Sequence, residues 1–517
     1  MPAGSRGRGC PLTADTETRP AGNERAAGSR PLSAPARAGR AVVHRAGPAT
    51  VAFLLLAGIF GLVFAVMSPP FWGHDELTQF GRAYQVSQGG LGPTAIEDDR
   101  GVAYGGEVPA AVEALMGFAL DDYTHNPGEP FPLVADPGAY QRLSDAPVTD
   151  EQKTVWFTNT AAYSAVPYIP NAIGIWTADL VGADAGTLVR LTRLAGLASY
   201  LLVVGFALWA LRAHRIQWLA FTVAVLPIAV FQAGTITADT LTNALALLVS
   251  ALLVKGLFLG DRLGRTETAA VMACAVLLPL CKPTYILLAM LVVLIPAERM
   301  GLTGWRRWVT WVCAGLGAAG FAVWMKIAAP TGEGTSLMRP QHQWYTVDTG
   351  EQLIGILTDP FGFLRTFWES ILRRDHEWFT EFFGELGFAY VNVPATAIVA
   401  CLLALAVSVG TAERFAHPDF RRTLVVALTM AASVAMIYVT LYMSFTPVGY
   451  YIIDGVQGRY FIPLAIVTLV VLLRWMPLRL RGPDDREPGR GAAVTIVVAA
   501  TIALVATVAK YHIYVWA

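Results

Sequence analysis

The sequence is poor in charged residues. Asp, Glu, Lys and Arg make up only 15% of its 517 residues, whereas soluble proteins carry about a quarter. Acidic and basic residues balance at 38 each, so no basic excess suggests a nucleic-acid partner. Hydrophobic residues reach 55%. The composition excludes an ordinary soluble protein and favours one that is embedded in a lipid bilayer.

Cysteine is also scarce. Four of the five cysteines lie in apolar runs, and the other, Cys10, lies near the N-terminus. No spacing among them resembles a zinc site or a disulfide framework. We therefore interpret Cys274, Cys281, Cys313 and Cys401 as small apolar residues within the membrane.

Residues 1–47 lack Ile, Phe, Trp and Tyr altogether and contain 8 Arg against 3 acids. Such a segment has too little apolar surface to fold by itself. An apolar run from Val51 to Met67 follows, and prolines rather than a small-residue cleavage site come after it. The run is too long for a typical signal peptide. We expect a disordered, basic, cytoplasmic tail and an uncleaved first membrane helix.

Long apolar segments predict an all-α integral membrane protein. A span needs about 20 mostly apolar residues, and eleven candidates are found, with ten to thirteen as the range. The pair between 267 and 298 is the weakest, because Lys282 and Pro283 divide it. A twelfth candidate, 161–181, contains two prolines and is equally compatible with a surface helix. The eleven are 49–68, 187–211, 216–235, 238–258, 267–282, 283–298, 308–327, 389–411, 422–446, 459–477 and 491–511.

The arginines and lysines of the short loops predict the orientation. They recur in alternate loops, on the same side as the basic tail, which is the cytoplasmic side by the positive-inside rule. Eleven spans then place the C-terminus outside the plasma membrane. The outward loops 69–160 and 328–388 contain 14 acids against 4 bases and 9 against 4, with aromatic patches that suggest short surface helices. We divide the chain into the tail 1–47, a transmembrane domain 48–480, and a cytoplasmic linker with the last helix, 481–517.

Two adjacent acids follow the first span in "SPPFWGHDELTQFGRAY". Asp75 and Glu76 are compatible with the charged start of a helix, where acids favour the helix dipole. They are equally compatible with catalytic carboxylates at the outer membrane surface, able to accept a proton from a hydroxyl group or to hold a divalent cation. A metal ion would need further oxygen ligands from the loops.

Three more charged residues fall at outward ends of spans. Asp239 is the sole charged residue between 216 and 254, and such residues are usually functional, although Asp is also a preferred helix N-cap. Lys282 and Arg459 are compatible with simple interfacial anchoring. Arginine also suits phosphate recognition. Outward acids and cations at lipid level fit a substrate with a lipid tail and a phosphate head.

Several stretches in a fixed order resemble a bacterial multi-pass family of predicted membrane proteins of unknown function. They are "SPPFWGHDELTQFGRAYQVSQGG", "NTAAYSAVPYIPNAIG", "LPIAVFQAGTITADTLTNALALL", "CKPTYILL", "GELGF" and "QGRYFIPL", and the resemblance covers roughly residues 50–480. The family is in turn similar to the GT-C superfamily of membrane glycosyltransferases, which use polyprenyl-phosphate-linked sugars and carry an acidic motif in the first outward loop.

That resemblance implies roles for particular residues. Asp75, Glu76 and Asp239 become the catalytic candidates, with Asp75 and Glu76 as ligands of any Mg²⁺ or Mn²⁺. The substrate-binding candidates are His74, Gln79, Arg82, Lys282, Tyr285, Arg459 and Tyr460. One departure is clear: the family opening reads D-E-x-x-H, and Gln79 stands in place of the histidine. Glutamine cannot act as a base, so a histidine-dependent step or metal ligation there is in doubt.

The sequence thus favours an inverting, GT-C-like glycosyltransferase of the plasma membrane. It would move a sugar from an undecaprenyl- or decaprenyl-phosphate donor to a cell-envelope glycan or lipid outside. The alternatives are a flippase or exporter of lipid-linked glycans, and a non-catalytic envelope assembly protein. A transporter should carry charges along its spans, whereas here the ionisable residues gather at one face; Gln79 is the feature that favours the assembly protein.

Overall fold

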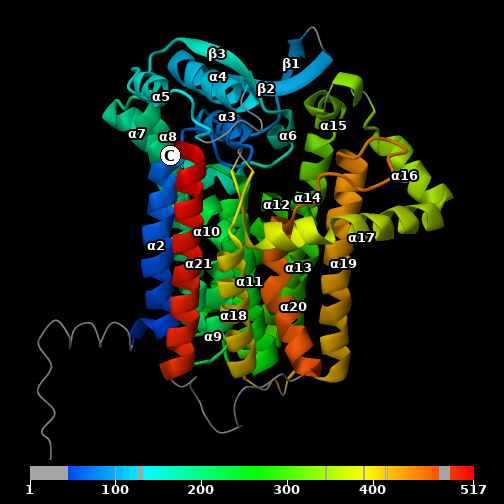
Figure 1. The fold of residues 1–517 in the computed structure, drawn as a ribbon. Coiled ribbons are helices and arrows are strands. Elements are labelled where there is room, and N and C mark those ends of the chain that lie inside the picture. Colours follow the sequence, from blue (N-terminus) through cyan, green and yellow to red (C-terminus); the bar gives the residue numbers. More distant parts are fainter. Residues whose placement is uncertain are drawn as a thin grey trace, which may run out of the picture. The chain divides into compact units, whose positions relative to one another are not determined.

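The computed structural model describes residues 45–98, 101–125, 132–339, 341–343, 346–387, 390–413, 415, 417–476 and 490–517. The chain divides into two units, Met1–Arg45 and Ala46–Ala517. What we predicted for the tail up to residue 44, and for the linker 477–489, lies outside the described residues. The second unit is a bundle of long apolar helices with a folded cap at one end (Figure 1).

Seven helices of the described chain are long and apolar enough to cross a membrane, and each coincides with one of the eleven predicted spans. All seven are apolar along nearly their whole length, which is why the sequence located them. They contain α2 (Pro48–Met67), α8 (Ala185–Ala210), α11 (Ala238–Leu253), α14 (Val309–Ala328), α19 (Phe420–Ser444), α20 (Ile462–Trp475) and α21 (Arg490–Trp516). Adjoining helical turns lengthen three of them, to Ala238–Leu259 for α11, Gly304–Ala328 for α14 and Gly458–Trp475 for α20.

The other four predicted spans are shorter or interrupted, so seven of the eleven are full-length helices in the described residues, and the total number of spans stays a prediction. Proline is the physical cause of these interruptions. It has no backbone N–H to donate, and it favours an extended backbone at the residue before it. Pro227 separates α9 (Gln217–Ala224) from α10 (Pro227–Ala233). Lys282, extended before Pro283, ends α12 (Arg265–Cys281). Short helices follow, including α13 (Ile286–Met290), and α18 (Ala395–Thr411) starts after a further proline.

The cap is built from residues 68–184 and is not purely helical. It contains α3 (Glu76–Ser87), α4 (Ala110–His125), α5 (Pro137–Ser144), α6 (Thr158–Ala161) and α7 (Ile169–Val181). An antiparallel sheet in the order β1-β2-β3 joins them, formed by β1 (Ala95–Asp98), β2 (Gly101–Pro109) and β3 (Gln152–Trp156). The all-α expectation therefore holds for the bundle but not for this loop. Segment 161–181, our twelfth candidate, forms short pieces and α7 rather than a span.

The second acid-rich loop lies at the same end of the bundle as the cap (Figure 1). It contains α15 (Thr331–Thr335), α16 (Thr349–Thr358) and α17 (Pro360–Gly384), followed by the small hairpin of β4 (Glu385–Leu386) and β5 (Val391–Asn392). Helix α17 runs across the direction of the spans. The expected surface helices are thus present, and one of them is 25 residues long.

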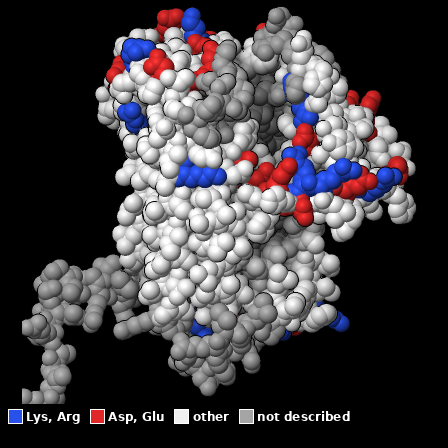
Figure 2. Space-filling view, viewed as in Figure 1, with Lys and Arg blue, Asp and Glu red and all other residues white. Residues whose placement is uncertain are grey.

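Charge divides the molecule along the bundle. On the face shown in Figure 2, acidic and basic side chains gather over the cap and along α17, and the flank of the bundle is almost free of them. At the opposite end the short loops meet: Glu413 accepts a hydrogen bond from the Ile216 amide, and Arg299 donates one to the Gly256 carbonyl. The described parts of these loops therefore lie at one end of the bundle, as the alternation of arginines predicted. Which end faces the cytoplasm stays a prediction.

Helix α11 is the centre of the core. It is buried on nearly all sides and packs against α8, α12 and α20. A helix that is apolar all round belongs in such a position. Its first turn reaches the cap end of the bundle, where it meets the polar residues of the opening loop.

Candidate functional site

The opening loop makes a tight turn between α2 and α3. Phe71 and Asp75 both have positive φ values, 68° and 51°, a conformation that is costly for most residues other than glycine, asparagine and aspartate and is often found at functional sites. Trp72 fixes the turn from the cap side by donating to the Tyr140 hydroxyl at 2.6 Å. Asp75 occupies the N-cap position of α3, yet its carboxylate makes no capping bond and is half-exposed. The helix-start interpretation therefore does not account for this side chain.

Glu76, the neighbouring acid, is fully buried. Arg193 of α8 donates to its two oxygens at 2.8 and 2.6 Å, and the Gly73 and Ile236 amides donate at 2.8 and 2.9 Å. The same guanidinium also donates to three carbonyls at the end of the first span, those of Ala65, Ser68 and Pro69. Glu76 is therefore engaged as a buried ion-pair partner, and a role as a catalytic base or a metal ligand stays a prediction.

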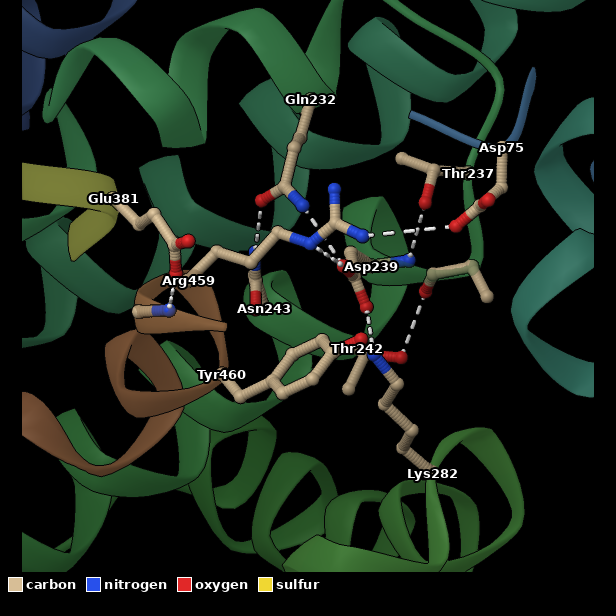
Figure 3. A network of polar contacts seen from close by, with 12 residues as sticks. Asp75, Gln232, Thr237, Asp239, Thr242, Asn243, Lys282, Glu381, Arg459 and Tyr460 are labelled. Carbon is tan, nitrogen blue, oxygen red and sulfur yellow. Dashed lines mark hydrogen bonds and ion pairs between the residues drawn. The ribbon is translucent and has the colours of Figure 1, made fainter. Parts of the chain in front are cut away.

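Asp239 does not cap its helix. Thr237 is the N-cap residue of α11, and its hydroxyl accepts from the Asp239 amide. The Asp239 carboxylate instead accepts from Lys282 at 2.5 Å and from Gln232 at 2.8 Å (Figure 3). All these groups are buried, so neither charge is hydrated. The ion pair of Asp239 with Lys282 compensates for the hydration that each charge loses. Lys282 is therefore committed to Asp239 rather than anchored at the interface.

Arg459 is a cation of the site with N–H groups that donate no hydrogen bond within the described residues. It begins the segment that leads into α20, and its side chain is 7% exposed. Its Nη2 lies 3.7 Å from Asp75 Oδ2, and its Nε lies 3.7 Å from Asp239 Oδ2 (Figure 3). Both distances are too long for good hydrogen bonds. The Nε and Nη1 groups have no hydrogen-bond partner among the described residues. Such buried, unmatched donors are rare and call for an explanation.

His74 lies beside this arginine. Its ring is buried against Phe231 and Tyr390, and its Nδ1 has no hydrogen-bond partner among the described residues. Burial, and then the charge of Arg459, hold the pKa of His74 well below its usual value. The imidazole is therefore neutral at physiological pH. Its Nδ1 is a third unmatched polar atom, after the two nitrogens of Arg459.

The remaining predicted residues mostly hold the fold together. Gln79 accepts from the Tyr168 hydroxyl at 2.6 Å and from the Ala238 amide, which ties α3 to the start of α11. Arg82 binds carbonyls of the loop after α3, including that of Leu91 at 2.7 Å. Gln79 thus acts as an acceptor, and within the described residues neither side chain forms a hydrogen bond or an ion pair with Arg459.

The two tyrosines we predicted meet at the lysine. Tyr285 donates to the Tyr460 carbonyl at 2.9 Å. Lys282 Nζ lies 4.4 Å from the centre of the Tyr460 ring, a distance that suits a cation–π contact. The Tyr163 ring lies 5.9 Å from the same nitrogen. Aromatic faces thus line the lysine side of the site.

Several residues of this region were missed from the sequence. Arg193 was detectable, since an arginine inside an apolar span must find a partner. Glu381 and Glu385 were not, although Glu385 lies in the quoted stretch "GELGF". Glu381 accepts from the Gly458 amide at 2.5 Å. Burial and then Glu381 raise the pKa of Glu385 to about 7, against the opposing influence of Arg459.

The residues do not fit a divalent cation. Magnesium and manganese prefer about six oxygen ligands, and the predicted pair points apart, with Glu76 bound to Arg193 and Asp75 directed to Arg459. Across the described ranges no group of three or more His, Cys, Asp or Glu side chains is placed to hold a metal ion. We assign no metal-dependent step to this site.

An apolar helical bundle with most of its buried charges gathered at one end defines a multi-pass membrane protein. Residues 56–468 match the family described as "Predicted membrane protein (DUF2142)", and the chain belongs to that family. No curated protein matches it significantly. Among solved structures it is similar to ArnT from Cupriavidus metallidurans in the apo state, with 14% identity over 92% of this chain and 78% of that one. The TM-score is 0.29, too low for this likeness to bear on activity.

Proposed function

We propose that the protein is a GT-C-like glycosyltransferase that moves a sugar from a polyprenyl-phosphate donor to a cell-envelope acceptor outside the plasma membrane. The observation that carries the proposal is Arg459, a buried guanidinium with two unmatched N–H groups beside an accessible carboxylate. The similarity of the family, which the quoted stretches resemble, to the GT-C superfamily supports the same reaction class. Placement of both acid-rich loops at one end of the bundle supports chemistry at a membrane surface.

Arg459 would bind the donor phosphate through the end of its guanidinium, where the unmatched Nη1 lies next to Nη2. A guanidinium presents its donors in a planar fork that matches two phosphate oxygens. When the bond between the sugar and the phosphate oxygen breaks, the bonding electrons stay with that oxygen and the polyprenyl phosphate gains a negative charge. The arginine then interacts more strongly with the leaving group than with the bound donor, which is the condition for accelerating the reaction.

Asp75 would act as the general base. The acceptor hydroxyl gives its proton to the carboxylate while its oxygen forms the new bond to the sugar. Among the three predicted carboxylates, Asp75 is the half-exposed one, whereas Glu76 is enclosed with Arg193 and Asp239 is held by Lys282 and Gln232. Asp239 and Lys282 would therefore position Arg459 and Tyr460 rather than touch the acceptor.

Product formation in nanodiscs tests the proposal. Purified protein is given a panel of undecaprenyl-phosphate sugars and acceptor glycans, and new glycosidic product is measured per folded molecule. Asp75→Asn should lower turnover about a hundredfold or more, and Glu97→Gln, which changes an exposed acid of the cap, should leave it unchanged. Absence of product from the unaltered protein over the whole panel would refute the enzyme and favour a transporter or an assembly role.

A further inference from the structure

Helix α17 holds the segment that leads to Arg459. We name residues 453–458 the strap, because they run along α17 and end directly before the arginine. One face of the helix, made by side chains three or four residues apart, contacts the strap at four successive places. The contacts are Ser370 with the Ile453 amide at 2.8 Å, Arg374 with Asp454 at 3.2 Å, Trp378 with the Val456 carbonyl at 2.9 Å and Glu381 with the Gly458 amide at 2.5 Å.

The contact is closest at the end next to the arginine. Gly458 packs so tightly that a Cβ atom there would run into the backbone of Trp378 and Phe382. A glycine is therefore required where the two backbones approach each other. The position of Arg459 is consequently tied to the position of α17.

A second face of α17 is apolar and uncovered. Five large side chains separated by three, four, four and seven residues lie on one side of the helix, and their exposed fractions run from 48% to 81%. Helix α16 continues the same band with Leu353, Ile354 and Leu357, each at least 44% exposed. The five are Phe361, Leu364, Trp368, Leu372 and Phe379.

A third face carries charge. Arg365, Glu369, Arg373 and Glu377 form a stripe of side chains, with Arg365 and Glu369 paired at 2.9 Å. Figure 2 shows this stripe along α17. A helix with separate apolar and charged faces is the form that lies in the plane of a membrane surface.

The position of α16 and α17 along the bundle agrees with a place at the membrane surface. Gln352 of α16 donates to the Thr446 carbonyl, two residues past the end of α19. At the other side, α17 is followed by only ten residues, 385–394, before α18 begins. Both ends are therefore fixed where apolar helices of the bundle end, which is the depth of a lipid interface.

We infer that α16 and α17 dock their apolar face into the outer surface of the lipid bilayer, and that this docking sets the position of Arg459 through the strap. Apolar burial supplies the attraction, and the helices would lie about 5–10 Å deep, at the boundary of headgroups and acyl chains. The docking is independent of what the protein does. Its effect on Arg459 rests on the proposed function, in which that arginine binds a lipid phosphate.

Spin labels measure the docking directly. Single cysteines at Leu364 and Leu372, and at the adjacent charged positions Arg365 and Arg373, are labelled with a nitroxide in the full chain. The protein is placed in phosphatidylethanolamine–phosphatidylglycerol vesicles, and unaltered protein gives the background from its native cysteines. We expect the leucine positions to collide with oxygen and the arginine positions with a water-soluble nickel complex. Leucine labels that meet the nickel complex as readily as the arginine labels would overturn the docking, as would labels shielded from both, which would indicate protein contact.

Binding of undecaprenyl phosphate measures the coupling. Glu381→Gln keeps the shape of the strap contact but weakens its last hydrogen bond, and should lower affinity for this lipid about tenfold in nanodiscs while the label depths stay unchanged. Glu369→Gln, on the charged face, serves as the control and should bind normally. Equal affinity of both variants would refute the coupling. Correct depths with no binding by unaltered protein would leave the docking intact and refute the phosphate site.

Discussion

Arg193 and Glu76 give the sharpest test of how the opening loop is held. Substituting Arg193 by methionine keeps a similar volume but leaves a carboxylate with no exposure beside two amides alone. Breaking a buried pair in this way costs about 3–5 kcal/mol. The three carbonyls that the guanidinium also satisfies would lose a partner each, so we expect the upper part of that range.

The assay is thermal unfolding in detergent, followed by tryptophan fluorescence. Arg193→Met should lower the apparent melting temperature by at least about 5 °C, whereas Arg190→Met, at an exposed position of the same helix, should change it little. Glu76→Gln should also destabilise. The double substitution Arg193→Met with Glu76→Gln should be milder than the sum of the two, because the unpaired charge is removed with its partner.

Two outcomes would refute this reasoning. One is an Arg193→Met variant that melts with the control, which would mean that the pair contributes nothing. The other is a Glu76→Gln variant with the melting temperature of the unaltered protein but no turnover. That second result would show that Glu76 takes part in the chemistry after all.

Four further outcomes are expected. Cysteines introduced at Gly89 and Glu351 should react with an impermeant thiol reagent in intact cells, and one at Asp419 should not. The reverse labelling pattern would show that the predicted orientation in the membrane is wrong. The Glu385 carboxyl keeps its proton to about pH 7 in the folded protein and loses it at lower pH in the unfolded chain. The melting temperature should therefore fall as the pH rises from about 5 to 8. Glu385→Gln should make the melting temperature depend less on pH over this range. Arg459→Lys should leave a measurable residual turnover and Arg459→Ala less, whereas equal rates would remove the phosphate contact. EDTA should leave the melting temperature unchanged, and a clear decrease would reveal a bound cation.

The long spans could be located from the sequence because a long apolar run is visible in consecutive residues. It overcounted where proline divides an apolar run, as at Pro227, since composition alone does not show whether the two halves form one helix. It placed no strands in the cap, because the pairing of β2 with β3 joins residues 43 to 51 positions apart. Contacts of that range are not visible in local patterns.

The site was predicted in part for the same reason. Asp75, Asp239, Lys282 and Arg459 were selected as charges at the ends of apolar segments, and the structure brings all four together. The sequence alone could not show that Asp75 is exposed while its neighbour Glu76 is buried in an ion pair. The residue that distinguishes them, Arg193, lies 117 positions away in the chain.

The left-handed backbone at Asp75 limits what this position can become. At a φ of 51°, glycine, asparagine and aspartate are tolerated, and other residues lose about 1–2 kcal/mol. Of the three tolerated residues, aspartate alone ionises. An acid of any other length is therefore disfavoured by the main chain before its chemistry is considered, so Asp75→Glu would be strained as well as misplaced. Engineers who wish to change the acidity of this group should alter its neighbours, because aspartate is the carboxylic acid that this backbone position accepts with the least strain.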